Sequence, residues 1–348
     1  MNDFSRRTLL QSSAALAVGG LSWRSLAAHA ASNSASSIKG DTIEHRTFGK
    51  TGLSIAVLGF GGAEIGYENT DQKTVDELLN AALDAGLDVV DTAECYINSE
   101  EQIARAIGRR RKEYHLFTKV GHWVPDGQPK DFAWTKDGVL ASIERSLKRL
   151  NTDVLELVQL HSCNVDILKR GECIEGLEAA KKAGKTRFIG YSGDSAAASF
   201  AVESDRFDTL QTSVNICDQQ SIELTLPLAK EKNMGVIAKR PIANAVWRYD
   251  APPANDYHSE YYSRLQKLNY DFAKGERAKD AGPEGAAGIA LRFTLMQHVH
   301  TAIVGTSNPK RWAQNAGLTK AGPLTDAQHK SIRETWKNAS PENWVGQV

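Results

Sequence analysis

The fold of this chain is decided by three runs that read LDVVD at residues 87–91, YHLFTK at residues 114–119 and VLELVQLH at residues 154–161. Each run is short, apolar and rich in β-branched or aromatic residues, which predicts a buried strand. Stretches of helical periodicity lie between them, at residues 99–108 and 135–150. This alternation of strands and helices predicts a parallel sheet covered by helices.

The alternation continues in both directions from these runs. Further strands are predicted at residues 54–61, 186–190, 209–211, 235–239 and 301–304, and further helices at 74–85, 174–183 (ending at Gly184), 196–203, 224–232, 284–297 and 309–317. Eight strand–helix units, without a Gly-x-Gly-x-x-Gly turn after the first strand, favour an α/β fold of the (β/α)8 TIM-barrel type over a doubly wound sheet.

Two segments lie outside the eight units. Residues 44–55 are expected to form an N-terminal β-hairpin that plugs the barrel from below. Residues 243–282 are polar and aromatic and form a long loop after strand 7. A loop of that length in a compact domain is usually a binding element, so we expect a lid over substrate or cofactor; a surface excursion with short helices is the alternative.

Composition and charge exclude several classes of protein. The 348 residues are 41% hydrophobic, which is enough for a large core, and 42 basic residues balance 42 acidic ones. A formal net charge of zero argues against a nucleic-acid partner. The four cysteines have no CxxC or zinc-type spacing, so they are interpreted as buried thiols and no metal site is expected.

The first thirty residues differ from the rest of the chain. Arg6 and Arg7 precede a mildly apolar stretch at residues 14–21, and Ala28-His29-Ala30 follows as a small-x-small site. This is the order of a removable signal peptide, and the arginine pair resembles the twin-arginine (Tat) export signal of bacteria. We therefore expect a signal at 1–30 cleaved near Ala30, a Ser-rich linker at 31–42 and the barrel at 43–348. The expected location is the periplasm, with the twin-arginine export machinery as a partner and no membrane span after cleavage.

Four residues of complementary chemistry stand at or just after consecutive strand ends. Asp91 ends the second strand, Tyr96 follows it, Lys119 ends the third strand and His161 ends the fourth. In a barrel these strand ends meet at one mouth. Carbonyl reduction needs a neutral proton donor, and a nearby ammonium lowers the pKa of a phenol. We therefore predict that Tyr96 donates the proton, Lys119 lowers its pKa, Asp91 pairs with Lys119, and His161 orients the carbonyl.

The motifs around these residues closely resemble those of the aldo-keto reductase family. They read DTAECY at residues 91–96, Ser99-Glu100, FTK at 117–119 and Leu160-His161, and the resemblance spans about residues 44–318. It implies a catalytic tetrad of Asp91, Tyr96, Lys119 and His161. It also implies reduction of an aldehyde or ketone to an alcohol, or the reverse, by hydride transfer with a nicotinamide cofactor.

The resemblance further implies how the nicotinamide half of the cofactor is held. The implied residues are Gly61 and Gly62 in the first strand's turn, Asp91, Ser192 and Gln211. Gly193 stands where the family has an asparagine that holds the carboxamide. Lys239 and Arg240 stand where the family often has a stacking aromatic, and cations there suit a pyrophosphate or an anionic substrate.

The segment after the eighth strand resembles the family's site for the adenosine 2′-phosphate. It opens a helix, whose N-terminus suits an anion. The implied ligands are Thr306, Ser307 and Arg311 for the phosphate, and Gln314 and Asn315 for adenine. Gly305 stands where many NADPH enzymes have a lysine, but Arg311 matches the arginine that favours NADPH. We therefore expect NADP(H) rather than NAD(H).

Substrate contacts are expected from aromatic side chains near the mouth, namely His122, Trp123 and Trp247. Two other functions stay open: a cofactor-binding redox sensor with slow turnover, as in channel-associated members of the family, and an aldolase-type barrel enzyme that uses Lys119 as a Schiff base. Cys95 and Cys163 flank two residues of the tetrad, so a disulfide between them is a further pairing to test.

Overall fold

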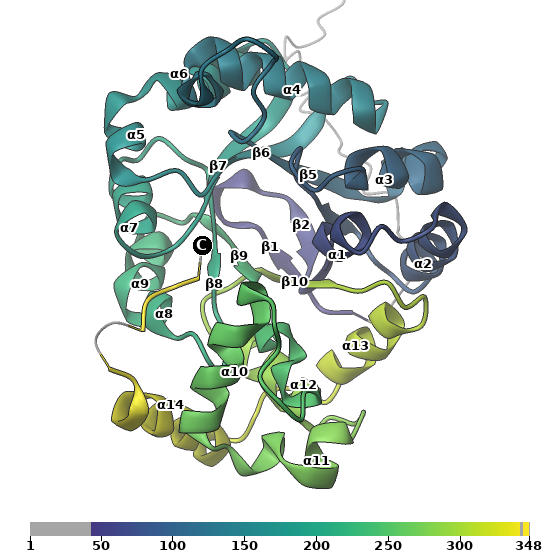
Figure 1. The fold of residues 1–348 in the computed structure, drawn as a ribbon, viewed down its shortest axis with the longest axis vertical. Helices are drawn as coiled ribbons and strands as arrows, with labels where there is room; N and C mark the ends of the chain where they lie inside the picture. The colour runs from purple at the N-terminus through teal and green to yellow at the C-terminus, as the bar shows by residue number, and fades with distance from the viewer. Residues whose placement is uncertain (1–42, 342–343, 348) are drawn as a thin grey trace, which may run out of the picture. The chain divides into compact units, whose positions relative to one another are not determined.

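The computed structural model describes residues 43–341 and 344–347 of the chain, so the expected signal and linker lie outside the described residues. Eight parallel strands close into a barrel in the order β10-β3-β4-β5-β6-β7-β8-β9, with helices around it (Figure 1). The strands are β3 Leu58–Gly61, β4 Val89–Asp91, β5 His115–Val120, β6 Leu155–His161, β7 Thr186–Ser192, β8 Thr209–Ser213, β9 Gly235–Lys239 and β10 Thr301–Gly305. The predicted (β/α)8 TIM barrel is confirmed.

The predicted crossover helices cover the outside of this barrel. They are α2 Gln72–Asp84, α3 Ser99–Ile107, α4 Lys136–Leu150, α6 Glu172–Lys182, α7 Ser195–Glu203, α9 Leu226–Glu231, α12 Ala286–Leu295 and α13 Arg311–Thr319. Local signals set several of their ends. The Asp71 side chain accepts from the backbone N–H of Thr74 to begin α2, and Thr135 does the same for α4. Gly184 follows α6 with a φ of +76°, as expected of a C′ glycine.

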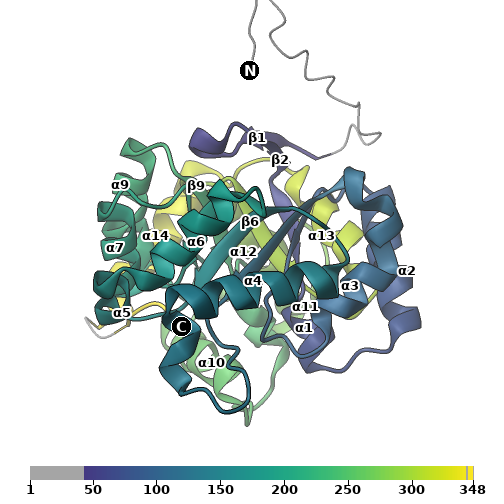
Figure 2. The ribbon, with the colours of Figure 1, turned by 90° about the horizontal axis from the view of Figure 1, so that it is seen from above.

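The N-terminal hairpin is formed by β1 (His45–Thr47) and β2 (Ser54–Ala56) and lies at one end of the barrel (Figure 2). The single strand predicted at residues 54–61 is therefore wrong: β2 ends at Ala56 and β3 begins at Leu58. Phe48 and Ile55 carry the hairpin's contact with the barrel interior, because they pack in one cluster with Phe117 and Leu157. Burying Phe48 in this way stabilises the fold by about 3–5 kcal/mol relative to alanine.

The long segment after β9 contains short helices rather than an open loop. It comprises η4 Ala243–Arg248, α10 Asp256–Leu268, η5 Asp271–Ala273 and α11 Gly275–Lys279. Tyr261 and Leu265 of α10 pack with Phe293 of α12 and with Trp336 in a separate hydrophobic cluster. This packing fixes the segment at the end of the barrel opposite the hairpin (Figure 2). The segment therefore has short helices of its own, and its expected role as a binding element stays a prediction.

Sequence periodicity missed several short helices and one long one. The short ones are α1 Ala63–Tyr67, α5 Val165–Arg170 and α8 Gln220–Leu224. The long one is α14, Asp326–Ala339, which begins with a capping box between Thr325 and Gln328. Among the described residues, no helix is both long enough and apolar enough to cross a membrane.

Candidate active site

The carboxyl ends of neighbouring strands bring the predicted tetrad to one mouth of the barrel. In the parallel register Asp91 lies level with Gly61 on one side and with Phe117 on the other, and His161 lies level with Ser192. These side chains therefore converge because the strands end together, as expected for this fold.

Asp91 and Lys119 form a buried ion pair at the centre of the site. Each side chain is 1% exposed, and Lys119 Nζ donates to both carboxylate oxygens of Asp91, at 2.8 Å to Oδ2. The same Nζ donates to the carbonyl of Thr92 at 2.9 Å. Burial raises the pKa of Asp91, while Lys119 and a hydrogen bond from Gln211 oppose that rise. The predicted counter-ion role of Asp91 agrees with this geometry.

Tyr96 lies in the turn after β4, beside the buried pair. Lys119 Nζ is 5.1 Å from the centre of its ring, and the ring of His161 meets it edge-on at 5.6 Å. Burial, followed by the negative charge of Asp91, raises the pKa of Tyr96 well above its ordinary value. The expected lowering by Lys119 does not set the direction of this shift, because burial and the charge of Asp91 both favour the protonated phenol. The phenol is held in its protonated form.

His161 is neutral in this environment. Burial lowers its pKa well below the ordinary value, and the positive charge of Lys119 lowers it further. The Sγ atom of Cys95 lies 3.4 Å from Nδ1 of His161. Because burial raises the pKa of Cys95 to about 11, that thiol keeps its proton and can donate it to Nδ1. In the tautomer whose Nδ1 accepts from this thiol, the imidazole carries its proton on Nε2, where it is a donor.

Glu94 lies in the DTAECY motif, but the sequence alone assigned it no role, and its contacts appear only in the structure. Its buried Oε1 accepts from three consecutive backbone N–H groups, those of Gly121 at 2.7 Å, His122 at 2.9 Å and Trp123 at 3.1 Å. Glu94 thereby fixes the loop that carries two of the predicted substrate residues. Its position two residues before Tyr96 in the DTAECY motif was the available signal.

The predicted substrate residues have different neighbours. The ring of His122 lies 4.9 Å from that of His161, so His122 is at the catalytic mouth. Trp123 stacks under the guanidinium of Arg145 at 5.0 Å. Trp247 packs against the cluster of α10, α12 and α14.

Two exposed residues next to Tyr96 were missed. Tyr67 is 59% exposed and its ring lies 5.5 Å from that of Tyr96. Ile97 is 55% exposed and has a φ of +50°, which is strained for a β-branched residue. Strained backbone of this kind is found at functional sites, and both residues give the surroundings of Tyr96 an apolar surface.

The glycines and amides predicted for the nicotinamide surround the same mouth. Gly62 donates its N–H to the carbonyl of Asp91 at 2.7 Å, and a Cβ there would approach Ser99 Oγ to 2.8 Å. Ser192 and Gln211 are paired in register on β7 and β8. Gln211 is already engaged, because it donates to Asp91 at 3.3 Å and accepts from Gln159 at 2.7 Å.

Lys239 and Arg240 are also engaged by the protein itself. Lys239 Nζ lies 2.8 Å from Asp194 Oδ2, and Arg240 donates to Ser213 Oγ at 3.1 Å and to the carbonyl of Gln347. The guanidinium of Arg240 also lies 5.3 Å from the ring of Tyr257 in α10. Sequence reasoning did not find Asp194 or Gln347, because these partners come from distant segments.

The predicted phosphate and adenine residues cluster after β10. Thr306 Oγ1 accepts the N–H of Asn308, and α13 then begins at the exposed Arg311. Gln314 is exposed, whereas Asn315 is 4% exposed and its Nδ2 has no hydrogen-bond partner among the described residues. A buried unpaired amide is costly, so Asn315 has capacity for a ligand.

Gly305 is crowded by a carboxylate. A Cβ built on Gly305 would lie 1.6 Å from Glu64 Oε2, so a side chain there would require the Glu64 carboxylate to move. Burial raises the pKa of Glu64 to about 7. Many NADPH enzymes carry a lysine at this position. Here the residue is Gly305, and the Glu64 side chain occupies the space beside it.

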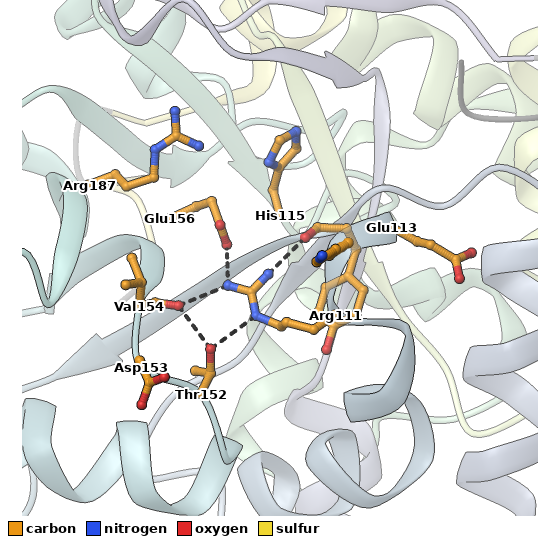
Figure 3. A pocket seen from close by; sticks show the side chains of 10 residues that line it. Arg111, Glu113, His115, Thr152, Asp153, Val154, Glu156 and Arg187 are labelled. Carbon is orange, nitrogen blue, oxygen red and sulfur yellow. Dashed lines mark hydrogen bonds and ion pairs between the residues drawn. The ribbon is translucent and has the colours of Figure 1, made fainter. Parts of the chain in front are cut away.

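A separate cleft of about 450 Å³ lies at the other end of the barrel, where β5, β6 and β7 begin (Figure 3). Arg111 in its wall donates to Glu156 at 2.6 Å and to the carbonyls of Tyr114 and Val154. These bonds link strand ends to one another, so Arg111 stabilises the barrel. The cleft is remote from the tetrad.

Comparisons with known proteins show the family of this chain. The family model described as "Aldo/keto reductase family" matches residues 57–337. The chain therefore belongs to the aldo/keto reductase family, and it is an oxidoreductase of that family.

Solved and curated relatives match most of this chain. An aldo-keto reductase from Bacillus halodurans in its holo form is 26% identical, with a TM-score of 0.71 over 87% of this chain and 99% of its own. The L-galactose dehydrogenase of Arabidopsis thaliana is 26% identical over 85% of this chain and 96% of its own. The D-threo-aldose 1-dehydrogenase of a Pseudomonas species is 27% identical over 76% of this chain and 89% of its own.

Proposed function

We propose that this protein reduces an aldehyde or ketone to an alcohol, or catalyses the reverse reaction, with NADP(H) and with Tyr96 as general acid or base. The observation that carries this proposal is the convergence of Asp91, Lys119, Tyr96 and His161 at one mouth. A protonated phenol beside a neutral imidazole is the arrangement that carbonyl reduction requires.

In the proposed reaction each residue of the tetrad has a separate role. His161 donates from Nε2 to the carbonyl oxygen and orients it, and Tyr96 gives its proton to that oxygen as the alcohol forms. Lys119 then stabilises the phenolate, because Asp91 keeps Lys119 in place beside the ring. When bound, the nicotinamide cofactor supplies or accepts the hydride. The same groups oxidise an alcohol when each proton transfer is reversed.

The chain's own residues fit such a cofactor. We propose that Gly61, Gly62, Asp91, Ser192 and Gln211 border the nicotinamide, that Lys239, Arg240, Thr306, Ser307 and Arg311 face its phosphates, and that Gln314 and Asn315 hold adenine. The unpaired Nδ2 of Asn315 supports the adenine assignment. A matched pair of variants tests the phosphate assignment: Arg311→Ala is expected to weaken NADPH far more than NADH, whereas Lys310→Ala changes both little. Equal losses in Arg311→Ala would contradict the preference for NADP(H).

Replacing Tyr96 tests the proposed reaction. Tyr96→Phe keeps the ring but removes the proton, so kcat on model aldehydes is expected to fall by roughly 10²–10⁴-fold while NADPH still quenches protein fluorescence. Full activity in Tyr96→Phe would refute the proposed proton donor. No turnover of the wild-type protein over a broad aldehyde panel, with cofactor bound, would instead favour the slow redox sensor.

The aldolase alternative has a separate test. Lys119 Nζ is bound to Asp91 and to the carbonyl of Thr92, whereas an amine that forms a Schiff base must be free to attack a carbonyl carbon. Borohydride trapping of a substrate on Lys119 would nevertheless establish that reaction.

We further propose that residues 1–30 direct export through the twin-arginine machinery and that the mature protein works in the periplasm on a small carbonyl or alcohol, using His122, Trp123 and Trp247 as substrate contacts. Support comes from Arg6 and Arg7 before the apolar stretch. Fractionation of cells producing the chain with Arg6→Lys and Arg7→Lys is expected to leave the precursor inside. Unchanged processing would contradict twin-arginine export.

A further inference from the structure

After α14 the chain returns to the catalytic mouth, and residues 344–347 lie across strand ends there (Figure 1). The Gln347 carbonyl accepts a hydrogen bond from Arg240, which follows β9, and Ser213 Oγ at the end of β8 lies 3.4 Å from the same oxygen. The Gln347 N–H donates to the buried Asp218 Oδ2 at 3.2 Å. Side chains from two strand ends and one loop therefore hold this residue by its backbone.

Gly346 packs tightly against the loop that follows β7. Its N–H donates to Gln220 Oε1 of α8 at 3.0 Å. A Cβ built on Gly346 would lie 2.3 Å from the Cβ of Asp194, so a side chain there would force one of the two residues to shift. The lack of a side chain thus lets the backbone approach the partner of Lys239 closely.

Trp344 anchors the other end of this segment. It is 7% exposed, and its ring centre lies 5.3 Å from that of Trp336 in α14. Arg264 of α10 lies 5.4 Å from the Trp344 ring and donates to the carbonyl of Val345 at 2.8 Å. The segment is therefore held at both ends.

The segment lies next to a residue that is proposed to border the nicotinamide. Gln211 and Ser213 are two positions apart on β8, so their side chains point to the same side of the strand. Gln211 donates to Asp91 inside the barrel, whereas Ser213 contacts Gln347. Residues 344–347 therefore lie beside the proposed nicotinamide pocket, on the side of the mouth.

Arg240 is shared between this segment and the proposed cofactor site. Its Nη1 has two hydrogen atoms, and both are used, by Ser213 Oγ at 3.1 Å and by the Gln347 carbonyl. A cofactor phosphate that takes the second of these hydrogen atoms must therefore displace Gln347. A phosphate forms a stronger hydrogen bond with a guanidinium than a neutral carbonyl does, which favours the exchange, but the segment's other contacts oppose it.

We propose that the 344–347 segment occupies part of the cofactor groove and is displaced when NADP(H) binds. The inference rests on the proposed function, which assigns Gln211 and Arg240 to that groove. Because the segment must leave before the groove is complete, the apparent affinity for cofactor is reduced by the fraction of molecules in which it is released. By the same linkage, bound cofactor keeps the segment released.

Two variants release the segment without touching the tetrad. Gly346→Val adds a side chain where Asp194 already lies, and a chain ended after Val345 lacks Gln347 but keeps Trp344 in its cluster. Fluorescence titration should show that the Kd for NADPH falls roughly five- to fiftyfold in both variants. Val345→Ala is the matched control, because this side chain is 42% exposed and the change keeps every backbone hydrogen bond, so the Kd should not change.

Hydrogen–deuterium exchange observes the segment itself in the wild-type protein. The N–H groups of Gly346 and Gln347 are bonded to side chains, so they should exchange slowly in the free protein. Saturating NADPH should speed their exchange roughly tenfold or more. The N–H groups of residues 121–123, which are bonded to Glu94, provide the control and should not exchange faster.

The outcomes separate this inference from the proposed function. If NADPH binds the wild type, and the releasing variants bind it equally or more weakly, or NADPH slows the exchange at residues 346–347, the inference is wrong while the proposed cofactor stands. If NADPH binds none of these proteins, the proposed cofactor is wrong and the inference falls with it. Binding by the releasing variants alone would be the strongest form of the expected result. If neither variant folds, the exchange measurement on the wild type decides.

Discussion

Lys239 Nζ lies 2.8 Å from Asp194 Oδ2, which joins the end of β9 to the segment that follows β7. Asp194 also accepts from Thr212 Oγ1 and from the N–H of Ser213, both at 2.7 Å. Burial lowers the pKa of Lys239 to about 8, and Asp194 opposes that shift. Lys239 is thus already paired with Asp194 in the protein without cofactor.

Because Lys239 and Asp194 are paired, we expect that replacing Lys239 alone lowers stability strongly and that a second substitution at Asp194 restores most of it. Lys239→Met leaves the buried Asp194 carboxylate without its cation, so urea unfolding should show a loss of about 3–5 kcal/mol. Adding Asp194→Asn should recover most of that loss, because the double variant buries no unpaired charge. Strictly additive losses in the double-mutant cycle would show that the two residues do not interact.

The carboxylate of Glu64 predicts a pH dependence of cofactor binding. Burial raises its pKa to about 7, so Glu64 is mostly neutral at pH 6 and mostly ionised at pH 8. It fills the space over Gly305, next to the proposed phosphate residues Thr306 and Ser307. The Kd for NADPH should therefore rise roughly three- to tenfold between these pH values through charge repulsion.

Glu64→Gln provides the control for that measurement. The glutamine keeps the shape and removes the ionisation, so fluorescence titration should give a nearly flat Kd once the ligand's own titration, which both proteins share, is subtracted. A variant that follows the wild-type curve would assign the pH dependence to another group.

Because Cys95 contacts Nδ1 of His161, we expect its thiol to contribute modestly to the orientation of the imidazole. Cys95→Ala removes the donor to Nδ1, so the imidazole can rotate or change tautomer, and kcat/KM should fall roughly tenfold. Cys95→Ser replaces the thiol with a hydroxyl donor and should retain most activity. If the serine variant is as impaired as the alanine variant, the thiol contributes packing rather than a hydrogen bond.

We expect the pairing of His45 with Asp88 to make a pH-dependent contribution to the free energy of unfolding. Its Nε2 lies 3.1 Å from Asp88 Oδ2, and this hydrogen bond raises the pKa of His45 despite partial burial. A raised pKa in the folded state means that the contribution is fully present below pH 6.5 and is lost as pH rises through the folded value. Since His45 is partly exposed, the effect should be below about 1 kcal/mol.

Urea unfolding between pH 5.5 and 8.5 checks this expectation. His45→Gln retains a donor to Asp88 but does not titrate, so the difference in unfolding free energy between wild type and variant should shrink as pH rises. A constant difference would mean that His45 does not gain a proton on pairing.

Much of the fold and of the tetrad could be predicted from the sequence. Apolar runs can be recognised from residues that are adjacent in the sequence. They therefore located the strands that end at Asp91 and His161 and the strand that contains Lys119. Because parallel strands end at the same face, their positions alone predicted that these side chains meet. The hairpin was also predicted, but its boundary with β3 was not, since residues 54–61 are continuously apolar and carry no local break.

Only the tertiary structure decided which side chains are already paired. Lys239 is bound to Asp194, Glu94 holds the loop of His122, and Cys95 contacts the ring of His161. Such contacts depend on how loops of different strands pack over one another, and residue spacing along the chain does not encode those distances. The sequence by itself determined the barrel and the residues at its mouth, whereas long-range packing decided their partners and hence their charge states.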